Sequence, residues 1–248
     1  MFMIESKQGR IPLQKSMIRL LSIADLVTIL NATLGFIALL LVFSNEFQLA
    51  TAFILLGLLA DGLDGMIARK LGNGKLGEYL ESLADMISLS VAPLVLFYKI
   101  YYDSIALQPS QHLLLGGILV FSLLCSIIRL SSFSLLKQKQ FFIGLPTSAS
   151  ALFLVLMPYL LQEVWYALPI IVVLSLAMIS PIHFPKPGLM VNLVTAALII
   201  AVILLDGMYS TLAKLLLLVA LLAYIIIGPL YLYTKKRKQV SGTEDTHS

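Results

Sequence analysis

Hydrophobic residues run along this chain in long blocks that are separated by short polar or proline-containing segments. A helix needs about 20 apolar residues to cross the hydrocarbon core of a membrane, and most of the blocks approach that length. We therefore predict an all-α integral membrane protein, a polytopic bundle of about eight transmembrane helices. The eight blocks fall at about 24–43, 48–70, 77–101, 112–134, 147–162, 164–182, 188–208 and 211–234.

The composition agrees with this interpretation and excludes other classes of protein. Hydrophobic residues make up 59% of the 248 positions and charged residues only 12%, against about 25% charged residues in soluble domains. These values exclude a disordered chain, a nucleic-acid-binding domain and an ordinary soluble enzyme. The single cysteine, Cys125, cannot form an intrachain disulfide, so nothing indicates an oxidising compartment. The polar segment 235–248 is predicted to be a disordered tail.

The basic residues predict how the bundle is oriented. When the connections are assigned alternately to two sides, the side that holds the N-terminus has fifteen Lys and Arg residues, and the opposite side has two, Lys99 and Lys214. The positive-inside rule then places both termini in the cytoplasm, which requires an even number of helices. We expect a multi-pass protein of the cell membrane with a basic N-terminal arm over residues 1–20. The absence of an internal repeat weakens the case for a two-halved transporter.

Four acidic residues lie inside otherwise apolar blocks, and at the centre of a membrane helix each would cost roughly 2.5–3.5 kcal/mol on membrane-insertion scales. They are Asp61 and Asp64 in the second block and Glu81 and Asp85 in the third. The connection between these blocks is short, so the two helices are expected to be antiparallel neighbours with their acidic faces opposed near the cytoplasmic surface. Helical spacing puts five small residues on the same two faces: Gly65, Ala68, Gly77, Ala84 and Ser88.

Carboxylates gathered in this way repel one another unless they are protonated or hold a cation. Oxygen ligands suit hard ions such as Mg²⁺, Mn²⁺ or Ca²⁺, and no His or Cys is close by in sequence to form a zinc site. The small residues have two interpretations, because they allow close packing of membrane helices or leave room for a ligand. Arg69 favours the second, since a guanidinium can clamp a phosphate, although alone it is an ordinary cytoplasmic anchor.

These residues form a longer pattern, Asp61-x-x-Asp64-Gly65-x-x-Ala68-Arg69, then a gap of seven residues and Gly77-x-x-x-Glu81-x-x-x-Asp85. The pattern resembles the signature of the CDP-alcohol phosphotransferase family, D-x-x-D-G-x-x-A-R followed by G-x-x-x-D-x-x-x-D. There are two departures. The gap is one residue shorter than usual, and the third family aspartate is replaced by Glu81, whose side chain is one methylene longer. We still expect Glu81 to be a metal ligand.

The resemblance implies a metal-dependent transfer of a phosphatidyl-type group from a CDP-activated lipid to an alcohol, with release of CMP. It implies two divalent ions, Mg²⁺ or Mn²⁺, with Ca²⁺ as a non-productive occupant, and a homodimer. By the same resemblance Asp85 is the general base that deprotonates the acceptor hydroxyl. The implied metal ligands are Asp61, Asp64, Glu81 and Asp85. The implied contacts to CDP and its diphosphate are Asp61, Gly65, Ala68, Arg69 and Gly77.

Other segments are similar to the phosphatidylserine synthase branch of this family. They are the Thr28, Asn31 and Gly35 spacing and the stretches 82–93, 128–133 and 142–147. The stretch 128–133 lacks the second arginine of the branch's R-L-A-R-F element. The resemblance implies a catalytic core over 21–150, whereas the helices over 151–234 are similar only in hydropathy.

The implied substrates are L-serine and either CDP-diacylglycerol or CDP-archaeol. Arg129 is a candidate for pairing with the serine carboxylate, and Ser88 is a second candidate contact. Their alternatives are an interfacial anchor for Arg129 and local packing for Ser88, and Asn31 is either an interhelical contact or a nucleotide ligand. Rival functions are the same chemistry on glycerol phosphate or inositol phosphate, a divalent-cation transporter, or a non-catalytic family member with Glu81 as its defect.

Overall fold

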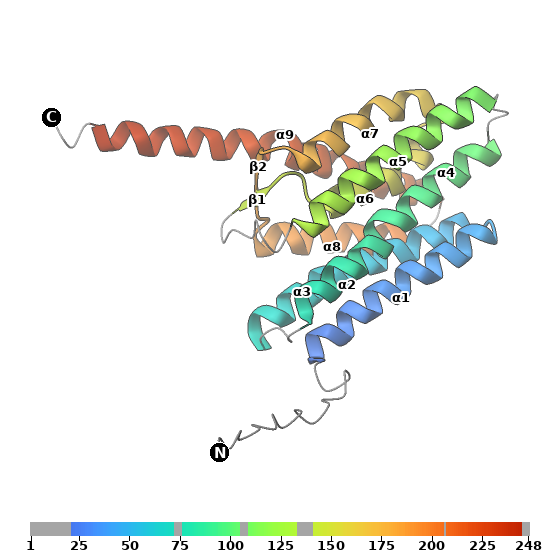
Figure 1. Ribbon diagram of the computed structural model, residues 1–248, viewed down its shortest axis with the longest axis horizontal. Coiled ribbons are helices and arrows are strands. Elements are labelled where there is room, and N and C mark those ends of the chain that lie inside the picture. The colour runs from blue at the N-terminus through green and yellow to red at the C-terminus, as the bar shows by residue number, and fades with distance from the viewer. Residues whose placement is uncertain (1–20, 72–75, 105–108, 133–140, 206, 245–248) are drawn as a thin grey trace, which may run out of the picture.

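The computed structural model describes residues 21–71, 76–104, 109–132, 141–205 and 207–244. Over these residues the predicted apolar blocks form helices that lie side by side in a bundle (Figure 1), so the all-helical architecture is confirmed. The third of the eight rods is continuous and has three labelled parts, α3, η2 and α4. The elements are α1 (Ile23–Phe43), α2 (Phe47–Leu71), α3 (Gly77–Asp85), η2 (Met86–Val91), α4 (Ala92–Ser104), α5 (Pro109–Ser131), α6 (Thr147–Leu160), α7 (Val164–Ile179), α8 (Leu189–Leu204) and α9 (Gly207–Glu244).

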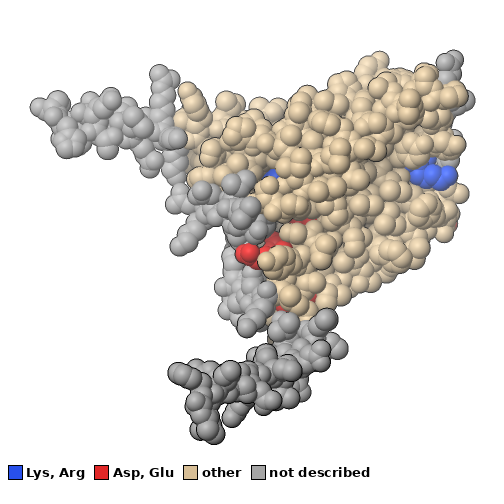
Figure 2. Space-filling model, viewed as in Figure 1, with Lys and Arg blue, Asp and Glu red and all other residues tan. Residues whose placement is uncertain are grey.

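Several of these helices are candidates for crossing a membrane. By length and composition, 4 qualify among the described residues: α1, the continuous helix Gly77–Tyr102, α5 and the segment Thr211–Thr234 of α9. The other apolar helices, counted over the described residues alone, are shorter: Phe47–Leu63, Thr147–Leu160, Val164–Ile179 and Met190–Leu204. Among the described residues, the face in Figure 2 shows few charged side chains. The protein is therefore a helical membrane protein, while its path across the bilayer stays a prediction.

Helix α1 begins with a capping box that explains a further buried acid. The Asp25 backbone N–H donates to Ser22 Oγ at 3.2 Å, and the Ser22 backbone N–H donates to Asp25 Oδ2 at 2.7 Å. This arrangement satisfies two N–H groups that a helix start leaves without partners. At the other end, Asn45 has φ +63°, a left-handed conformation that Asn tolerates, and the chain reverses there into α2.

The long third rod is interrupted by a π-helical turn, η2, directly after Asp85. The short connection between α2 and this rod predicts that they are neighbours, and contacts of α2 with η2 and α4 confirm this. That the acidic faces of α2 and α3 oppose each other stays a prediction. The α3 part packs mainly against α1. Helix α1 therefore lies against both helices that carry the four acids.

A small antiparallel ribbon was not predicted. Strand β1 (Phe141–Ile143) pairs with β2 (His183–Pro185), with Phe142 opposite Phe184. Gly144 follows β1 with φ +77°, and a Cβ there would overlap the carbonyl oxygen of Met178. The ribbon thus fastens the start of α6 to the end of α7, and glycine is required at the point of closest approach.

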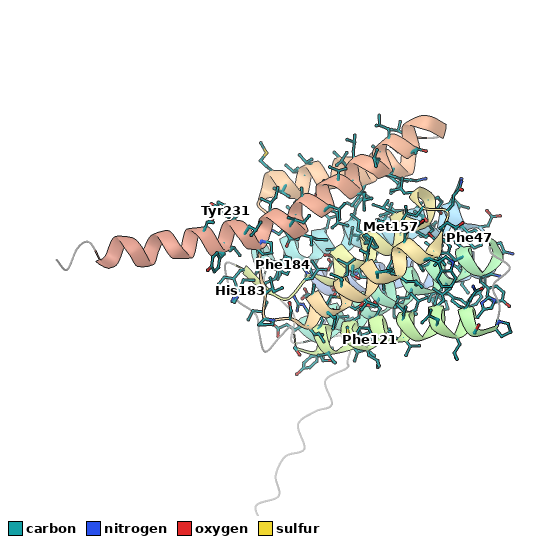
Figure 3. The ribbon with its side chains drawn as sticks, turned by 90° about the horizontal axis from the view of Figure 1, so that it is seen from above. Phe47, Phe121, Met157, His183, Phe184 and Tyr231 are labelled. Carbon is teal, nitrogen blue, oxygen red and sulfur yellow. The ribbon has the colours of Figure 1, made fainter. Side chains whose placement is uncertain are left out.

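The structure also differs from the predicted disordered tail, because α9 continues as a helix to Glu244. Residues 235–244 extend an existing helix and so do not bear the cost of nucleating a new one. Figure 1 shows α9 running out beyond the rest of the bundle. In Figure 3 the labelled His183 and Phe184 lie beside α9, and Tyr231 lies on the part that leaves the bundle.

Candidate active site

Asp85, the general-base candidate, lies at the junction between α3 and the π-helical turn η2. The side chain of Asn31 in α1 reaches across to it, and Asn31 Nδ2 donates to Asp85 Oδ1 at 3.1 Å. Asn31 is fully buried and Asp85 is partly buried. Because π-helical turns are rare and frequently occur at functional sites, this junction is the first structural indication of a reaction centre.

Close helix packing brings Asn31 to Asp85. A Cβ on Gly35 would lie 2.5 Å from the Cα of Ser88, so α1 and η2 are in backbone contact. A Cβ on Gly57 of α2 would lie 3.0 Å from Asn31 Oδ1 and 3.5 Å from Ser88 Cβ. Helices α1 and α2 and the π-helical turn therefore converge at one point, which we call the three-helix joint: Asn31, Gly35, Gly57, Asp85 and Ser88.

The structure places Ser88 inside this joint. Its side chain is fully buried, and its Oγ donates to the carbonyl oxygen of Ala84 at 3.0 Å. Such a bond within the same helix is what the packing interpretation expects. This bond and the burial of Ser88 favour local packing over a serine-binding role.

On the acid-bearing face of α2, the structure shows open space at Gly65. Asp61 and Glu81 are both partly buried. A Cβ on Gly65 would meet no atom within 4 Å, whereas Gly77 at the start of α3 is buried. The small residue at 65 is therefore not explained by close packing against a described neighbour. The side chains of Asp64, Ala68 and Arg69 lie outside the described part of the structure.

The donor set fits a hard divalent cation by its chemistry. It consists of carboxylate oxygens, which such ions prefer, next to the open side of Gly65. Among the side chains that the structure describes, no three His, Cys, Asp or Glu residues are close enough together to hold a metal ion. Metal binding by Asp61, Asp64, Glu81 and Asp85 therefore stays a prediction. Figure 2 shows acidic side chains gathered at the same end of the molecule as α3.

Arg129 is buried in the last turn of α5, with 7% of its surface exposed. Its Nε donates to the carbonyl oxygen of Leu145, at 3.4 Å, just after the β1–Gly144 turn. Ser82 Oγ lies 3.4 Å from the carbonyl oxygen of Leu130, which brings the end of α5 against α3 about one turn before Asp85. This burial argues against an interfacial anchor, because an anchor keeps its charge in water. Pairing of Arg129 with the serine carboxylate stays a prediction.

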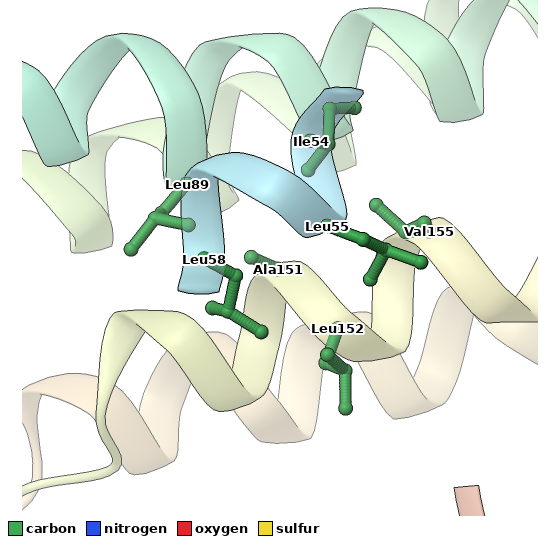
Figure 4. A pocket seen from close by; sticks show the side chains of 7 residues that line it. All are labelled: Ile54, Leu55, Leu58, Leu89, Ala151, Leu152 and Val155. Atoms are coloured by element: carbon green, nitrogen blue, oxygen red, sulfur yellow. The ribbon is translucent and has the colours of Figure 1, made fainter. Parts of the chain in front are cut away.

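An apolar crevice between α2, η2 and α6 lies apart from these polar groups (Figure 4). Its lining offers no acid, base or hydrogen-bonding side chain, so it is not where the chemistry takes place. The lining residues are Ile54, Leu55, Leu58, Leu89, Ala151, Leu152 and Val155.

Comparison of the sequence with those of known proteins identifies related proteins. The family model for CDP-alcohol phosphatidyltransferase matches residues 21–182. The chain is 36% identical over 169 residues to the CDP-diacylglycerol–serine O-phosphatidyltransferase of Methanocaldococcus jannaschii, covering 68% of this chain and 76% of the relative. It is 32% identical over 179 residues to the archaetidylserine synthase of Methanothermobacter thermautotrophicus, covering 69% and 73%. It is also 32% identical over 162 residues to the CDP-diacylglycerol–serine O-phosphatidyltransferase of Bacillus subtilis, covering 64% and 88%.

Proposed function

Because this chain belongs to the CDP-alcohol phosphatidyltransferase family, we propose that it transfers a phosphatidyl or archaetidyl group from CDP-diacylglycerol or CDP-archaeol to L-serine and releases CMP. The observation that carries the choice of serine is that relatives from an archaeon and a bacterium, at 36% and 32% identity, are both named as serine O-phosphatidyltransferases. The archaetidylserine synthase relative supports the same acceptor and extends the choice of lipid.

Asp85 is assigned the role of general base. The serine hydroxyl oxygen forms a bond to the lipid-bearing phosphorus of the CDP-lipid, and the bond from that phosphorus to the CMP oxygen breaks. The hydroxyl proton passes to the Asp85 carboxylate. A positioned base of this kind contributes about 10²–10⁴-fold to a rate, and the bond from Asn31 supports the assignment by holding this carboxylate at the joint.

The remaining acids and their neighbours are assigned to the CDP-lipid. Asp61, Asp64 and Glu81, with Asp85 beside them, would hold two divalent ions, Mg²⁺ or Mn²⁺. When bound, such ions neutralise the diphosphate and stabilise CMP as a leaving group. Four residues of the signature would contact the nucleotide and its diphosphate: Gly65, Ala68, Arg69 and Gly77. The open side of Gly65 supports this assignment, because a ligand there would meet no described side chain.

Arg129 is assigned to the carboxylate of serine. A guanidinium forms two parallel hydrogen bonds to a carboxylate, and such pairs are strongest when water is excluded. The burial of Arg129 and its place on a helix that contacts α3 support this role. An acceptor that carries a phosphate, such as glycerol phosphate or inositol phosphate, would require more cations than this arginine supplies.

The soluble substrates also bear on the position of the site. CMP and serine are water-soluble, so we place the active site at the cytoplasmic face of the cell membrane, with the lipid tails reaching it laterally from the bilayer. This side follows from the distribution of Lys and Arg along the chain. The resemblance to the family further suggests a homodimer.

The test uses purified full-length protein with CDP-diacylglycerol or CDP-archaeol, Mn²⁺ and labelled serine. We expect CMP and a serine-containing lipid in equal amounts. Parallel reactions contain glycerol phosphate or inositol phosphate, and transfer to one of these but not to serine would overturn the acceptor. Uptake of Mn²⁺ into vesicles without release of CMP would favour the transporter. Neither CMP release nor metal uptake would indicate a non-catalytic member.

A further inference from the structure

We propose that Asn31 is a positioning residue for the reaction, which holds the Asp85 carboxylate in the orientation needed to accept the proton of the acceptor alcohol. The inference rests on the proposed role of Asp85 as general base. It gives α1, which carries none of the four acids of the signature, a direct part in the function of the site.

The first observation is the hydrogen bond itself. Asn31 and Asp85 are 54 residues apart in sequence, and Asn31 Nδ2 donates to Asp85 Oδ1 at 3.1 Å. The amide is completely buried, with 0% of Asn31 exposed. A bond to an ionised acceptor is stronger than one between neutral groups. It therefore restricts the rotation of the carboxylate more than packing alone would.

The second observation concerns the oxygen of the same amide, Asn31 Oδ1. Among the described residues, Asn31 Oδ1 is buried without a hydrogen-bond partner. A buried acceptor left in this state is unfavourable, and an apolar side chain of the same size would avoid the problem. Packing alone thus does not account for an asparagine here. The donor that it directs at Asp85 does account for it.

The third observation is that the joint fixes which way the amide points. Gly57 leaves only enough space for Asn31 Oδ1, since a Cβ at Gly57 would lie 3.0 Å from that oxygen. If the amide were turned over, its oxygen would face the carboxylate oxygen of Asp85, and the two would repel. Gly35 presses α1 against the backbone of Ser88, three residues after Asp85. Repulsion between the two oxygens and the close packing of the helices therefore keep Asn31 Nδ2 directed at Asp85.

A fixed carboxylate affects the chemical step more than the binding of substrate. A displacement of about 1 Å in a reacting group can lower a rate by roughly 10²-fold. Loss of the Asn31 donor should therefore lower kcat, while KM for the CDP-lipid, which is set mainly by contacts to the nucleotide and diphosphate, should change little. A residue that only packs helices together would change stability without this separation.

The experiment compares Asn31→Leu with wild type and with Thr33→Val. Thr33 lies on the same helix, is exposed, and its Oγ1 donates to the carbonyl oxygen of Ile29 at 2.8 Å. From the rate of CMP release we expect Asn31→Leu to lower kcat about 30–100-fold and to change KM for the CDP-lipid less than about threefold. Thr33→Val should match wild type. A normal kcat in folded Asn31→Leu, or a loss confined to KM, would overturn the proposal.

A double variant separates positioning from an independent effect. If Asn31 acts through Asp85, adding Asn31→Leu to Asp85→Asn should lower the residual rate less than about threefold, because residues that act as a unit are not additive. A further loss as large as that of Asn31→Leu alone would show that Asn31 acts elsewhere, and would overturn the proposal.

Gly57→Ala covers the case in which Asn31→Leu does not fold. It keeps the amide but crowds Asn31 Oδ1, so kcat should fall several-fold, whereas Gly117→Ala, where a Cβ meets nothing within 4 Å, should leave it unchanged. An unaltered kcat in Gly57→Ala would then overturn the proposal.

All rates are measured with serine and with glycerol phosphate. If the wild type acts on glycerol phosphate alone, the proposed acceptor is wrong. The kcat of Asn31→Leu and of its controls would then be compared with glycerol phosphate as the acceptor.

Discussion

At the scale of single residues, the proposed chemistry depends most directly on the carboxylate of Asp85. Asp85→Asn keeps the size of the side chain but removes its ability to take up a proton. We expect kcat for CMP release to fall about 10²–10⁴-fold, the range for loss of a general base. Serine-dependent CMP release that survives this change would contradict the assignment. Thr33→Val provides the control on a helix that contacts the same site.

Glu81 departs from the family signature, and its substitution tests whether it is a metal ligand. Glu81→Gln keeps the length of the side chain and removes its charge, so we expect the Mn²⁺ concentration for half-maximal activity to rise at least about tenfold, consistent with the preference of hard cations for charged oxygen ligands. Glu81→Asp restores the family residue and keeps the charge, so it should remain active. The measurement is CMP release across a Mn²⁺ titration. Equal Mn²⁺ requirements in wild type and Glu81→Gln would show that Glu81 is not a ligand.

The acids could be found from the sequence because each one violates the apolar pattern around it. The residues that contact these acids could not be found in this way. The bond from Asn31 to Asp85 joins residues 54 positions apart, and no local pattern states which face of α1 turns toward α3. The burial of Arg129 was equally hidden, because an arginine at the end of an apolar block is also what an interfacial anchor looks like. Only the packing of the helices separates the two interpretations.

At the scale of helices, the contact between α1 and η2 should be sensitive to a single methyl group. Gly35→Ala would put a Cβ 2.5 Å from the Cα of Ser88, and backbone cannot give way as a flexible side chain can. We expect a loss of about 1–3 kcal/mol of stability, seen as a lower Tm in detergent, together with reduced activity. Gly117→Ala is the matched control, because its Cβ meets nothing within 4 Å. An unchanged Tm in Gly35→Ala would contradict the close contact.

The helices themselves were predictable because a long apolar block is a strong signal in a membrane protein. Two features that could not be predicted, the π-helical turn and the ribbon, have a common cause. The π-helical turn η2 continues the apolar pattern of the helix around it, so hydropathy carries no sign of it. The ribbon joins strands of three residues whose partners lie about forty positions apart, with Phe142 opposite Phe184. Both features are set by tertiary contacts and not by local propensity.

At the scale of the whole molecule, the C-terminal helices belong to the same structure as the matched region. The family match ends at residue 182, just before β2. Tyr224 of α9 donates to the carbonyl oxygen of Pro185 at 3.1 Å, and a Cβ on Gly228 would come within 2.9 Å of the Pro185 ring. Helix α9 therefore braces the ribbon. The ribbon leads into the loop whose Leu145 carbonyl accepts from Arg129, so the least recognisable part of the chain supports the proposed serine pocket.

The orientation of the whole bundle can be tested with introduced cysteines. Cys125 is 2% exposed and should not react with a membrane-impermeant maleimide, so it provides a silent background. Glu46 is exposed in the turn between α1 and α2, and His183 is the exposed residue of strand β2. The turn and the strand lie at opposite ends of the bundle (Figure 1), so we introduce Glu46→Cys and His183→Cys. In intact cells we expect labelling at 46 and not at 183, and in inverted membrane vesicles the reverse. Because Arg129 contacts the loop that follows the ribbon strand β1, labelling of 183 from outside the cell would place the proposed serine pocket away from the cytoplasm and contradict the site's assigned side.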